Sequence, residues 1–238
     1  MQNTNKNILI GIVAAALIAG GAWFLFGNQA HPLPVAEGDA ISSWDFQGSY
    51  EGNSELEKRA RDEIARSEGL LGGDQSGAND DPTDYILYVS IANQYELLGD
   101  GKAAYEYLGR ALRIDSTKTG LAWRNLGALM ERLGALNTAR IAYARAVEAQ
   151  SQIAEYHTAR IQFLIAHFAE DTAAIEAAFG EAEVGLEGTA PEIQQIKAQW
   201  YESIGMTQEA IEALREMERL MGGNVPTIRG EIARLRAS

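Results

Sequence analysis

The chain has 238 residues, enough for one or two domains, and 46% of them are hydrophobic, which suffices for a packed core. It has no cysteine, which excludes disulfides, thiolate nucleophiles and cysteine-ligated zinc. The formal net charge of -13 argues against a nucleic-acid partner, because phosphate binding needs a basic surface.

A long apolar stretch, residues 8–26, follows a short polar segment, residues 1–7, whose single charged side chain is Lys6. As a helix of 19 residues it would span roughly 28 Å, close to the ~30 Å hydrocarbon core of a bilayer. We interpret it as an uncleaved transmembrane anchor. A cleaved signal peptide is the alternative, but its apolar region is usually shorter.

The orientation of this anchor follows from the distribution of basic residues. Lys6 precedes the anchor, whereas His31 to Leu56 contains no Lys or Arg. The positive-inside rule therefore predicts a single-pass protein of the cytoplasmic membrane, with its N-terminus in the cytoplasm and the rest of the chain outside. Gly11, Ala15 and Ala19 have the spacing of a helix-packing stripe that would suit a transmembrane helix partner, although such stripes also arise by chance.

The next segments, residues 27–53, 54–68 and 69–80, are predicted to be an extended tether, a stalk helix and a flexible linker. The tether is rich in proline, glycine and acids. Its apolar cluster from Ile41 to Tyr50, which includes Trp44 and Phe46, could dock onto the rest of the chain, a partner or the membrane surface, or have no role. The stalk helix matches a capping box at Ser54, but its apolar content is thin, which predicts loose docking.

Residues 81–238, which open with an expected helix start at Asp81 and Pro82, contain one pattern of large and small residues written twice with an offset of 35 positions. In each copy the large and small residues of the first half fall on one face of a predicted helix. A glycine follows, and the residues of the second half fall on one face of a second predicted helix. The repeated positions include Tyr88, Ala92, Tyr95, Gly99 and Ala104, and later Trp123, Leu126, Gly127, Gly134, Ala139, Tyr143 and Ala146.

This pattern resembles that of the tetratricopeptide repeat (TPR) family, whose tryptophan, leucine and glycine spacing is matched by residues 123–127. The resemblance implies an all-α helical solenoid of about four helix–turn–helix repeats. A third repeat begins at Tyr156 in a looser register. A fourth begins at a capping box over residues 189–192, and residues 227–237 supply a capping helix.

Catalytic motifs were sought and not found in the sequence. It has no phosphate-binding loop, no zinc-binding helix motif and no nucleophile elbow. His157 and His167 on one helix would point about 80° apart, which is unfavourable for shared metal ligation, and both are expected at the surface. We therefore expect no enzyme activity, no cofactor and no metal.

The family resemblance also implies a concave groove that binds a protein or peptide. Ligand-facing positions lie one and five residues after the leading aromatic of each repeat. Carried over, they are Val89, Asn93, Arg124, Ala128, His157, Ile161, Gln195 and Gln199. One hypothesis is an extended peptide whose backbone bonds to Asn93, Gln195 and Gln199 while an acidic group meets Arg124. The alternative is that Asn93 and Asn125 are ordinary features of such repeats and bind no ligand of this kind.

The same resemblance implies a scaffold role. Together with the predicted anchor, it leads us to expect a membrane-anchored scaffold for assembly or maturation of a cell-envelope complex, such as cytochrome c maturation or translocon-associated chaperoning. The alternative is a structural subunit that assembles through its transmembrane helix and aromatic tether.

Overall fold

The computed structural model describes residues 30–73 and 83–237. The predicted anchor, residues 8–26, and the predicted helix start at Asp81 and Pro82 lie outside these residues. Contacts divide the chain into two units, residues 1–34 and 35–238, and every described helix belongs to the second. None of these helices has both the length and the apolar composition that crossing a bilayer requires.

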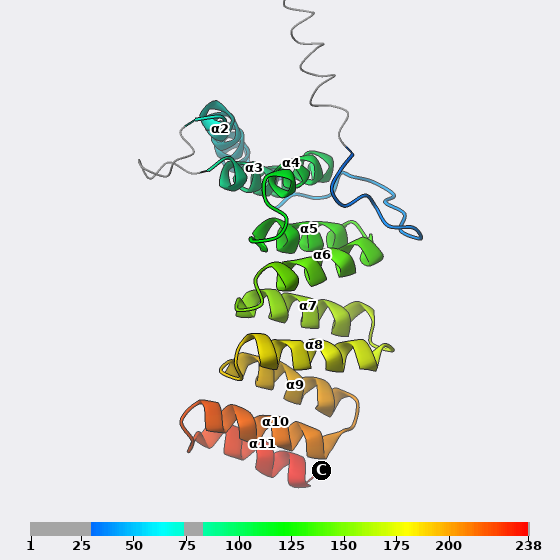
Figure 1. Cartoon of the computed structure of the whole chain (residues 1–238), viewed down its shortest axis with the longest axis vertical. Coiled ribbons are helices and arrows are strands. Elements are labelled where there is room, and N and C mark those ends of the chain that lie inside the picture. Colours follow the sequence, from blue (N-terminus) through cyan, green and yellow to red (C-terminus); the bar gives the residue numbers. More distant parts are fainter. Residues whose placement is uncertain (1–29, 74–82, 238) are drawn as a thin grey trace, which may run out of the picture. The chain divides into compact units, whose positions relative to one another are not determined.

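The second unit is built from consecutive helix pairs, which Figure 1 shows following one another along the chain. We call the earlier member of each pair its first helix and the later member its second helix. The pairs are α3 (Asp84–Leu98) with α4 (Gly101–Ile114), α5 (Leu121–Arg132) with α6 (Leu136–Ala149), α7 (Ala154–His167) with α8 (Thr172–Gly185), and α9 (Pro191–Ser203) with α10 (Thr207–Leu220). A single helix, α11 (Pro226–Ala237), follows. The predicted solenoid of four helix pairs and a capping helix is confirmed.

Glycines end the first helices of the two clear repeats, as predicted. Gly99 and Gly134 have φ values of +87° and +75°, a left-handed conformation that other residues adopt only at a cost. Gly127 has a different role, since a Cβ atom there would lie 2.8 Å from Cδ1 of Tyr143. The side chain of Tyr143 therefore lies directly against the backbone of α5.

Helix α2 (Ser54–Leu70) packs against α3, with Ala60 and Ile64 buried, so the prediction of a loosely docked stalk was wrong. Its Glu68 also accepts a hydrogen bond from the Tyr107 hydroxyl of α4. The helix begins one residue earlier than its capping box predicted, because Asn53 accepts the hydrogen bond from Leu56 N. The helix is docked by a few buried apolar residues and by a long-range hydrogen bond, and the number of apolar residues in its sequence does not reveal such contacts.

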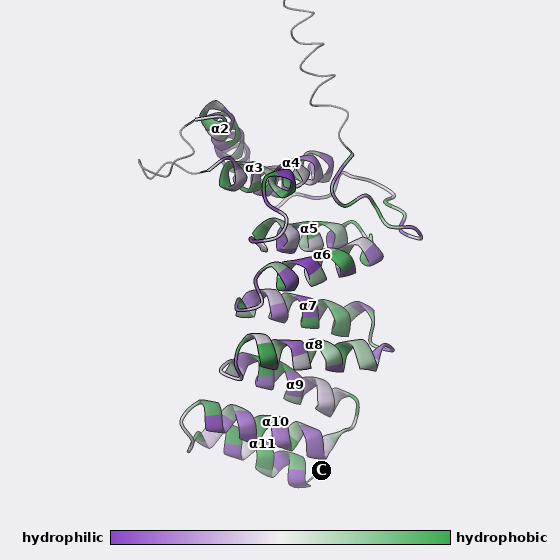
Figure 2. Cartoon of the chain, in the orientation of Figure 1, coloured by the Kyte–Doolittle hydropathy of each residue, from purple (hydrophilic) through white to green (hydrophobic). Residues whose placement is uncertain are grey.

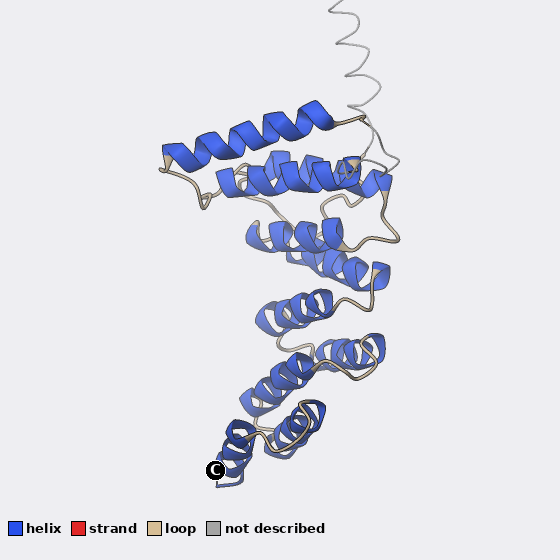
Figure 3. Cartoon of the chain, turned by 90° about the vertical axis from the view of Figure 1, so that its left-hand side faces the viewer, coloured by secondary structure: helices blue, strands red, loops and turns tan. Residues whose placement is uncertain are grey.

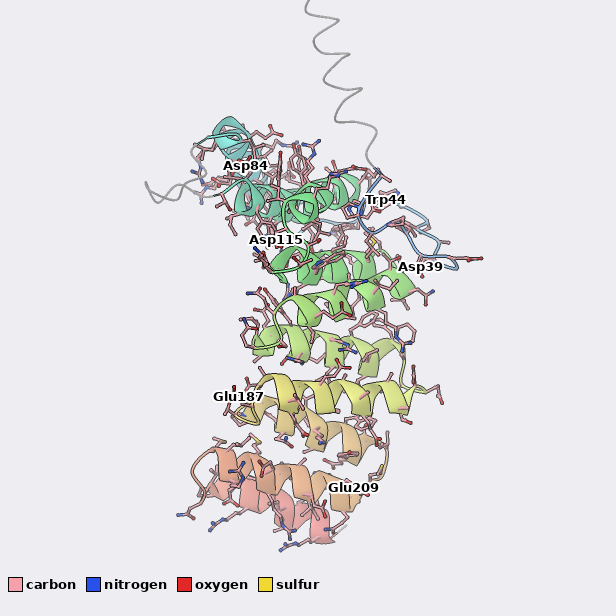
Figure 4. The ribbon with its side chains drawn as sticks, viewed as in Figure 1. Asp39, Trp44, Asp84, Asp115, Glu187 and Glu209 are labelled. Atoms are coloured by element: carbon pink, nitrogen blue, oxygen red, sulfur yellow. The ribbon has the colours of Figure 1, made fainter. Side chains whose placement is uncertain are left out.

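Residues 35–53, the strap, lie along the turns of the repeats rather than forming a free spacer (Figure 1, blue). Phe46 N donates to Gly99 O at 3.1 Å, and Gly101 N donates to Trp44 O at 3.0 Å. The rings of Trp44 and Tyr105 are 5.0 Å apart, and Figure 4 places Trp44 next to α4. The aromatic cluster could dock onto the rest of the chain, onto a partner or onto the membrane surface, and Trp44 docks onto the chain's own repeats.

Farther along the strap, the Asp39 carboxylate caps the N-terminus of α6. It accepts hydrogen bonds from the backbone N–H groups of Asn137 and Thr138 at 3.0 and 2.7 Å. These are among the first amides of the helix, which have no partner within it. The strap therefore supplies a helix cap that α6 itself lacks, since Ala135 at its N-cap position has no side-chain acceptor.

Hydrophobic and hydrophilic residues alternate along the described helices (Figure 2), and the apolar faces meet inside the helix pairs. Figure 3 shows helices joined by loops, with no strand in the described part. At the C-terminal end, Ile228, Ile232 and Leu235 of α11 close a core shared with α9 and α10. The predicted capping box of α9 is absent, because Ala190 occupies the N-cap position and the Thr189 hydroxyl donates to Leu186 O instead.

Candidate partner-binding groove

A line of polar side chains crosses the first helices of three successive repeats. Asn125 Nδ2 on α5 donates to Asn93 Oδ1 on α3 at 3.0 Å. Arg124 Nη1 donates to Asn125 Oδ1 at 3.4 Å, and Arg124 Nη2 forms an ion pair with Glu155 Oε1 on α7 at 3.0 Å. The structure therefore brings Asn93 and Arg124 into one connected network.

Arg124 is the centre of this network. Its side chain is 36% exposed, yet its Nε is buried and has no hydrogen-bond partner among the described residues. Leaving a buried donor unpaired costs free energy, which marks the site as unusual for a packed repeat. Glu155 is far more exposed, so an incoming acidic group can reach the outer Nη atoms of Arg124.

A second row of ionic contacts lies on the same first helices. Arg132 of α5 pairs with Glu96 of α3 at 3.3 Å. Glu131 accepts a hydrogen bond from the Tyr143 hydroxyl at 2.7 Å and lies 2.8 Å from His167 Nε2 of α7. Burial and the hydrogen bond to Glu131 both raise the pKa of Tyr143, so this phenol stays neutral and acts as a donor. The row links α3, α5, α6 and α7 through polar side-chain contacts.

Near the C-terminus a cavity of about 260 Å³ lies between α9 and α11. Gln195 and Gln199 line it together with the apolar side chains of Leu214, Ile228 and Leu235. Two carboxylates at the cavity, Glu202 and Glu231, are both bonded by Arg234. Their charge is thereby partly neutralised, so the cavity combines an apolar floor with amides that can donate and accept.

Five of the eight predicted groove residues are accessible: Asn93, Arg124, Ala128, Gln195 and Gln199. The other three, Val89, His157 and Ile161, are only 3%, 1% and 0% exposed and cannot contact a ligand, so their assignment was wrong.

For His157 the reason is visible. Its Nε2 lies 2.8 Å from Ser151 O, and a Cβ atom on Gly185 would lie 2.9 Å from that nitrogen. The ring therefore fills the space between the turn before α7 and the end of α8, and the expectation of a surface histidine was wrong as well. Helix α7 presents Glu155 to Arg124 in its place.

The residues that the sequence reasoning missed are charged partners on the neighbouring repeat. Glu155 and Glu96 each pair with an arginine of α5, which belongs to the adjacent repeat. The two pairs do not share a repeat position or an order of acid and base, so no periodic signal in the sequence indicated them. The described residues contain no group of three or more His, Asp or Glu that could hold a metal ion.

Comparison of the sequence with protein-family models gave no match, and comparison with curated proteins gave none. Among solved structures, the crystal structure of MamA superposes with a TM-score of 0.50 at 18% sequence identity, covering 73% of this chain and 96% of that one. A second crystal structure of MamA gives a TM-score of 0.47 at 19% identity, over 70% and 92% of the two chains. The chain therefore has a TPR-like helical repeat fold.

Proposed function

We propose that this protein is a scaffold that binds an extended segment of a protein partner along its first helices, α3, α5, α7 and α9. The carrying observation is the connected network of Asn93, Asn125, Arg124 and Glu155, which crosses three repeats. A surface that served only to hold neighbouring helices together would not need an exposed asparagine and a half-exposed arginine.

The chemistry of the groove favours an extended peptide with one acidic group. Amide side chains such as Asn93, Gln195 and Gln199 both donate and accept, which matches the alternating groups of a peptide backbone. Arg124 supplies the charge-assisted contact. Because guanidinium carries five N–H donors, a partner carboxylate can join or replace Glu155 there.

We further propose that residues 8–26 anchor the protein in the cytoplasmic membrane and hold the repeats outside the cytoplasm, where they serve assembly or maturation of a cell-envelope complex. The supporting observations are the uncharged stretch and the absence of Lys and Arg between His31 and Leu56. A fusion test checks this. Alkaline phosphatase fused to the C-terminus is expected to be active. An inactive fusion, together with an active cytoplasmic reporter at the same site, would show that the proposed orientation is wrong.

The groove is tested once a partner has been identified by crosslinking in membranes and mass spectrometry. Its peptide is titrated against the parent chain and against Arg124→Ala and Asn93→Ala. Loss of a charge-assisted bond should weaken binding by roughly ten- to a hundredfold for Arg124→Ala. Arg145→Ala is the matched control, because Arg145 lies on the second helix α6 and pairs with Glu148 of the same helix. Equal affinity for both groove variants and the parent, with folding intact, would place the interface elsewhere.

The alternative, a structural subunit that assembles through its transmembrane helix and aromatic tether, receives less support. The rings of Trp44 and Tyr105 contact each other in a tilted arrangement, and the guanidinium of Arg132 lies 5.0 Å from the ring of Phe46. Both aromatic side chains are thus already engaged by the chain's own repeats.

A further inference from the structure

Arg124, at the centre of the groove network, uses few of the five N–H donors of its guanidinium. Nη1 makes one long hydrogen bond, of 3.4 Å, to Asn125 Oδ1. Nη2 lies 3.0 Å from Glu155 Oε1, an ionic contact that lacks the alignment of a hydrogen bond. Nε is withdrawn from water and has no acceptor among the described residues, so water does not replace the missing partner. Arg124 is therefore a charged side chain whose bonding is incomplete.

Another ion pair between neighbouring helices has a different geometry. Arg160 of α7 bonds through Nη1 and Nη2 to the two carboxylate oxygens of Glu181 of α8. Such a two-point contact fixes the orientation of both groups. Glu155 meets Arg124 through one oxygen, and its side chain is 65% exposed. The contact between Arg124 and Glu155 therefore lacks the geometry of a tightly held structural pair.

Glu155 also has a second place that suits its charge. It lies in the first turn of α7, and the side chain of the N-cap residue, Ile153, offers that helix no acceptor. The first amides of a helix have no partners within it, and the positive end of the helix dipole attracts a carboxylate. Rotation of the Glu155 side chain can move its carboxylate from Arg124 towards the start of its own helix. The ion pair lost in this movement is partly exposed and contributes little to stability.

We propose that Glu155 is an internal ligand of Arg124, which a carboxylate side chain of the bound segment displaces. This role of Glu155 rests on the proposed function, and it makes Glu155 the residue that sets the selection for acidic segments. Nε and Nη2 form one edge of the guanidinium, and a carboxylate bonded to that edge through both oxygens would give Nε its missing acceptor. Glu155 already lies at Nη2, and two carboxylates cannot share that nitrogen without repulsion. The partner's carboxylate therefore binds only as Glu155 leaves.

The test follows the Nε–H signal of Arg124 in a proton–nitrogen correlation spectrum of the full-length chain in non-ionic detergent. Arg124→Lys identifies the signal by its loss. The ligand is an end-capped five-residue peptide with one aspartate between glycines, and the same peptide with asparagine is its neutral control. We expect the aspartate peptide alone to shift the signal. Glu155→Gln should tighten binding of that peptide by about two- to fivefold, in the range found for partly exposed ion pairs.

Two further variants separate the contact with Arg124 from the charge of Glu155. Glu155→Asp keeps the charge but shortens the side chain by one methylene, so it should also bind the peptide more tightly than the parent. Glu181→Gln is the matched control, because it removes the same charge from an arginine-bound glutamate on a second helix. It should leave the affinity unchanged. Thermal denaturation followed by circular dichroism checks that each variant is folded.

Four results would overturn the role of Glu155. Equal affinity of the parent and Glu155→Gln for the aspartate peptide would exclude displacement but leave Arg124 as an acid-binding residue of the groove. Weaker binding by Glu155→Gln would show that Glu155 orients Arg124 instead. A gain in Glu181→Gln equal to that in Glu155→Gln, or no gain in Glu155→Asp, would indicate a general effect of charge. A signal that no peptide shifts, in the parent and in Glu155→Gln alike, would also remove the acidic contact from the proposed function.

Discussion

The first two helix pairs and the last two follow the same repeat pattern, but they differ in the residues that occupy its large positions and in the segments that cover them. Around α3 to α6, aromatic residues fill the repeat's large positions, and the strap and α2 cover additional surface. Around α9 and α10, Gln194 and Ala213 stand where the first repeat has Tyr88 and Tyr107, and hollows open on two faces of α9. A repeat whose large residues are replaced thus leaves hollows at its surface, and the contacts with neighbouring repeats must supply the stability.

Charge follows the same division. The second helices of the first two pairs are basic, since α4 has three bases and one acid and α6 has two bases and one acid. Those of the last two pairs are acidic, since α8 has three acids and no base and α10 has four acids and two bases. The division predicts that cations are attracted more strongly to the later repeats than to the earlier ones.

The largest expected effect is that of Gly127→Leu in the earlier half. A Cβ atom at this position would lie 2.8 Å from the ring of Tyr143, so the side chain would force α5 and α6 apart. We expect a loss of about 1–3 kcal/mol in the free energy of unfolding, measured by urea denaturation followed by circular dichroism. An unchanged midpoint would mean that the two helices separate easily and that the earlier half is not tightly packed.

Trp44→Ala should have the next largest effect, because it removes the strap's main contact with α4. The Trp44 ring contacts that of Tyr105 in a tilted arrangement, and Lys102 Nζ lies 4.8 Å from the centroid of Trp44. Since the ring is only half-buried, we expect a cost of roughly 1–2 kcal/mol and faster proteolysis within the strap. Trypsin sensitivity equal to that of the parent would show that the strap is held by its backbone hydrogen bonds alone.

Asp39→Ala tests the cap that the strap supplies to α6, with an expected cost of about 1 kcal/mol near neutral pH. Burial acts to raise the pKa of Asp39, but hydrogen bonds from Thr138 and Asn137 outweigh it and lower the pKa below 3.8. Because the folded pKa is depressed, the stabilisation is present above the unfolded pKa near 4 and is lost as pH falls through the folded value. The difference between parent and variant should therefore shrink below about pH 4 in denaturation curves, and a difference that grew at low pH would contradict the cap.

The smallest effect, and one of opposite sign, is expected for Gly180→Ala in the later half. Gly180 lies within α8, and a Cβ atom there would meet no other atom within 4 Å. Alanine should stabilise the helix by roughly 0.5–1 kcal/mol because it restricts the unfolded chain. A destabilised variant would reveal a contact on the outer face of α8 and weaken the contrast with Gly127.

Much of the repeat architecture could be predicted because its signals are local. The alternation of large and small residues at helical spacing places Ala92 and Leu126 in the core, and Gly99 and Gly134 can end helices wherever a turn is required. Two of the predicted groove residues, Asn93 and Arg124, are connected through Asn125, while the groove itself stays a prediction. His157 and Ile161 were misplaced because the register of the third repeat is set by packing of α7 against α8, which a carried-over spacing does not contain.

By itself, the sequence determined the helix pairs and their turns, because these depend on residues that lie within about one repeat of each other. It also indicated the accessible groove positions of the first, second and fourth repeats, with the exception of Val89. Only the tertiary structure decided the role of the strap. Asp39 caps α6 although it lies 99 residues before Thr138, and Gly101 N donates a hydrogen bond to Trp44 O. Neither contact follows from a periodic pattern in the sequence. The cavity at Gln194 and Ala213 was decided in the same way, because a missing aromatic becomes a hollow only if the neighbouring helices do not move in to fill it.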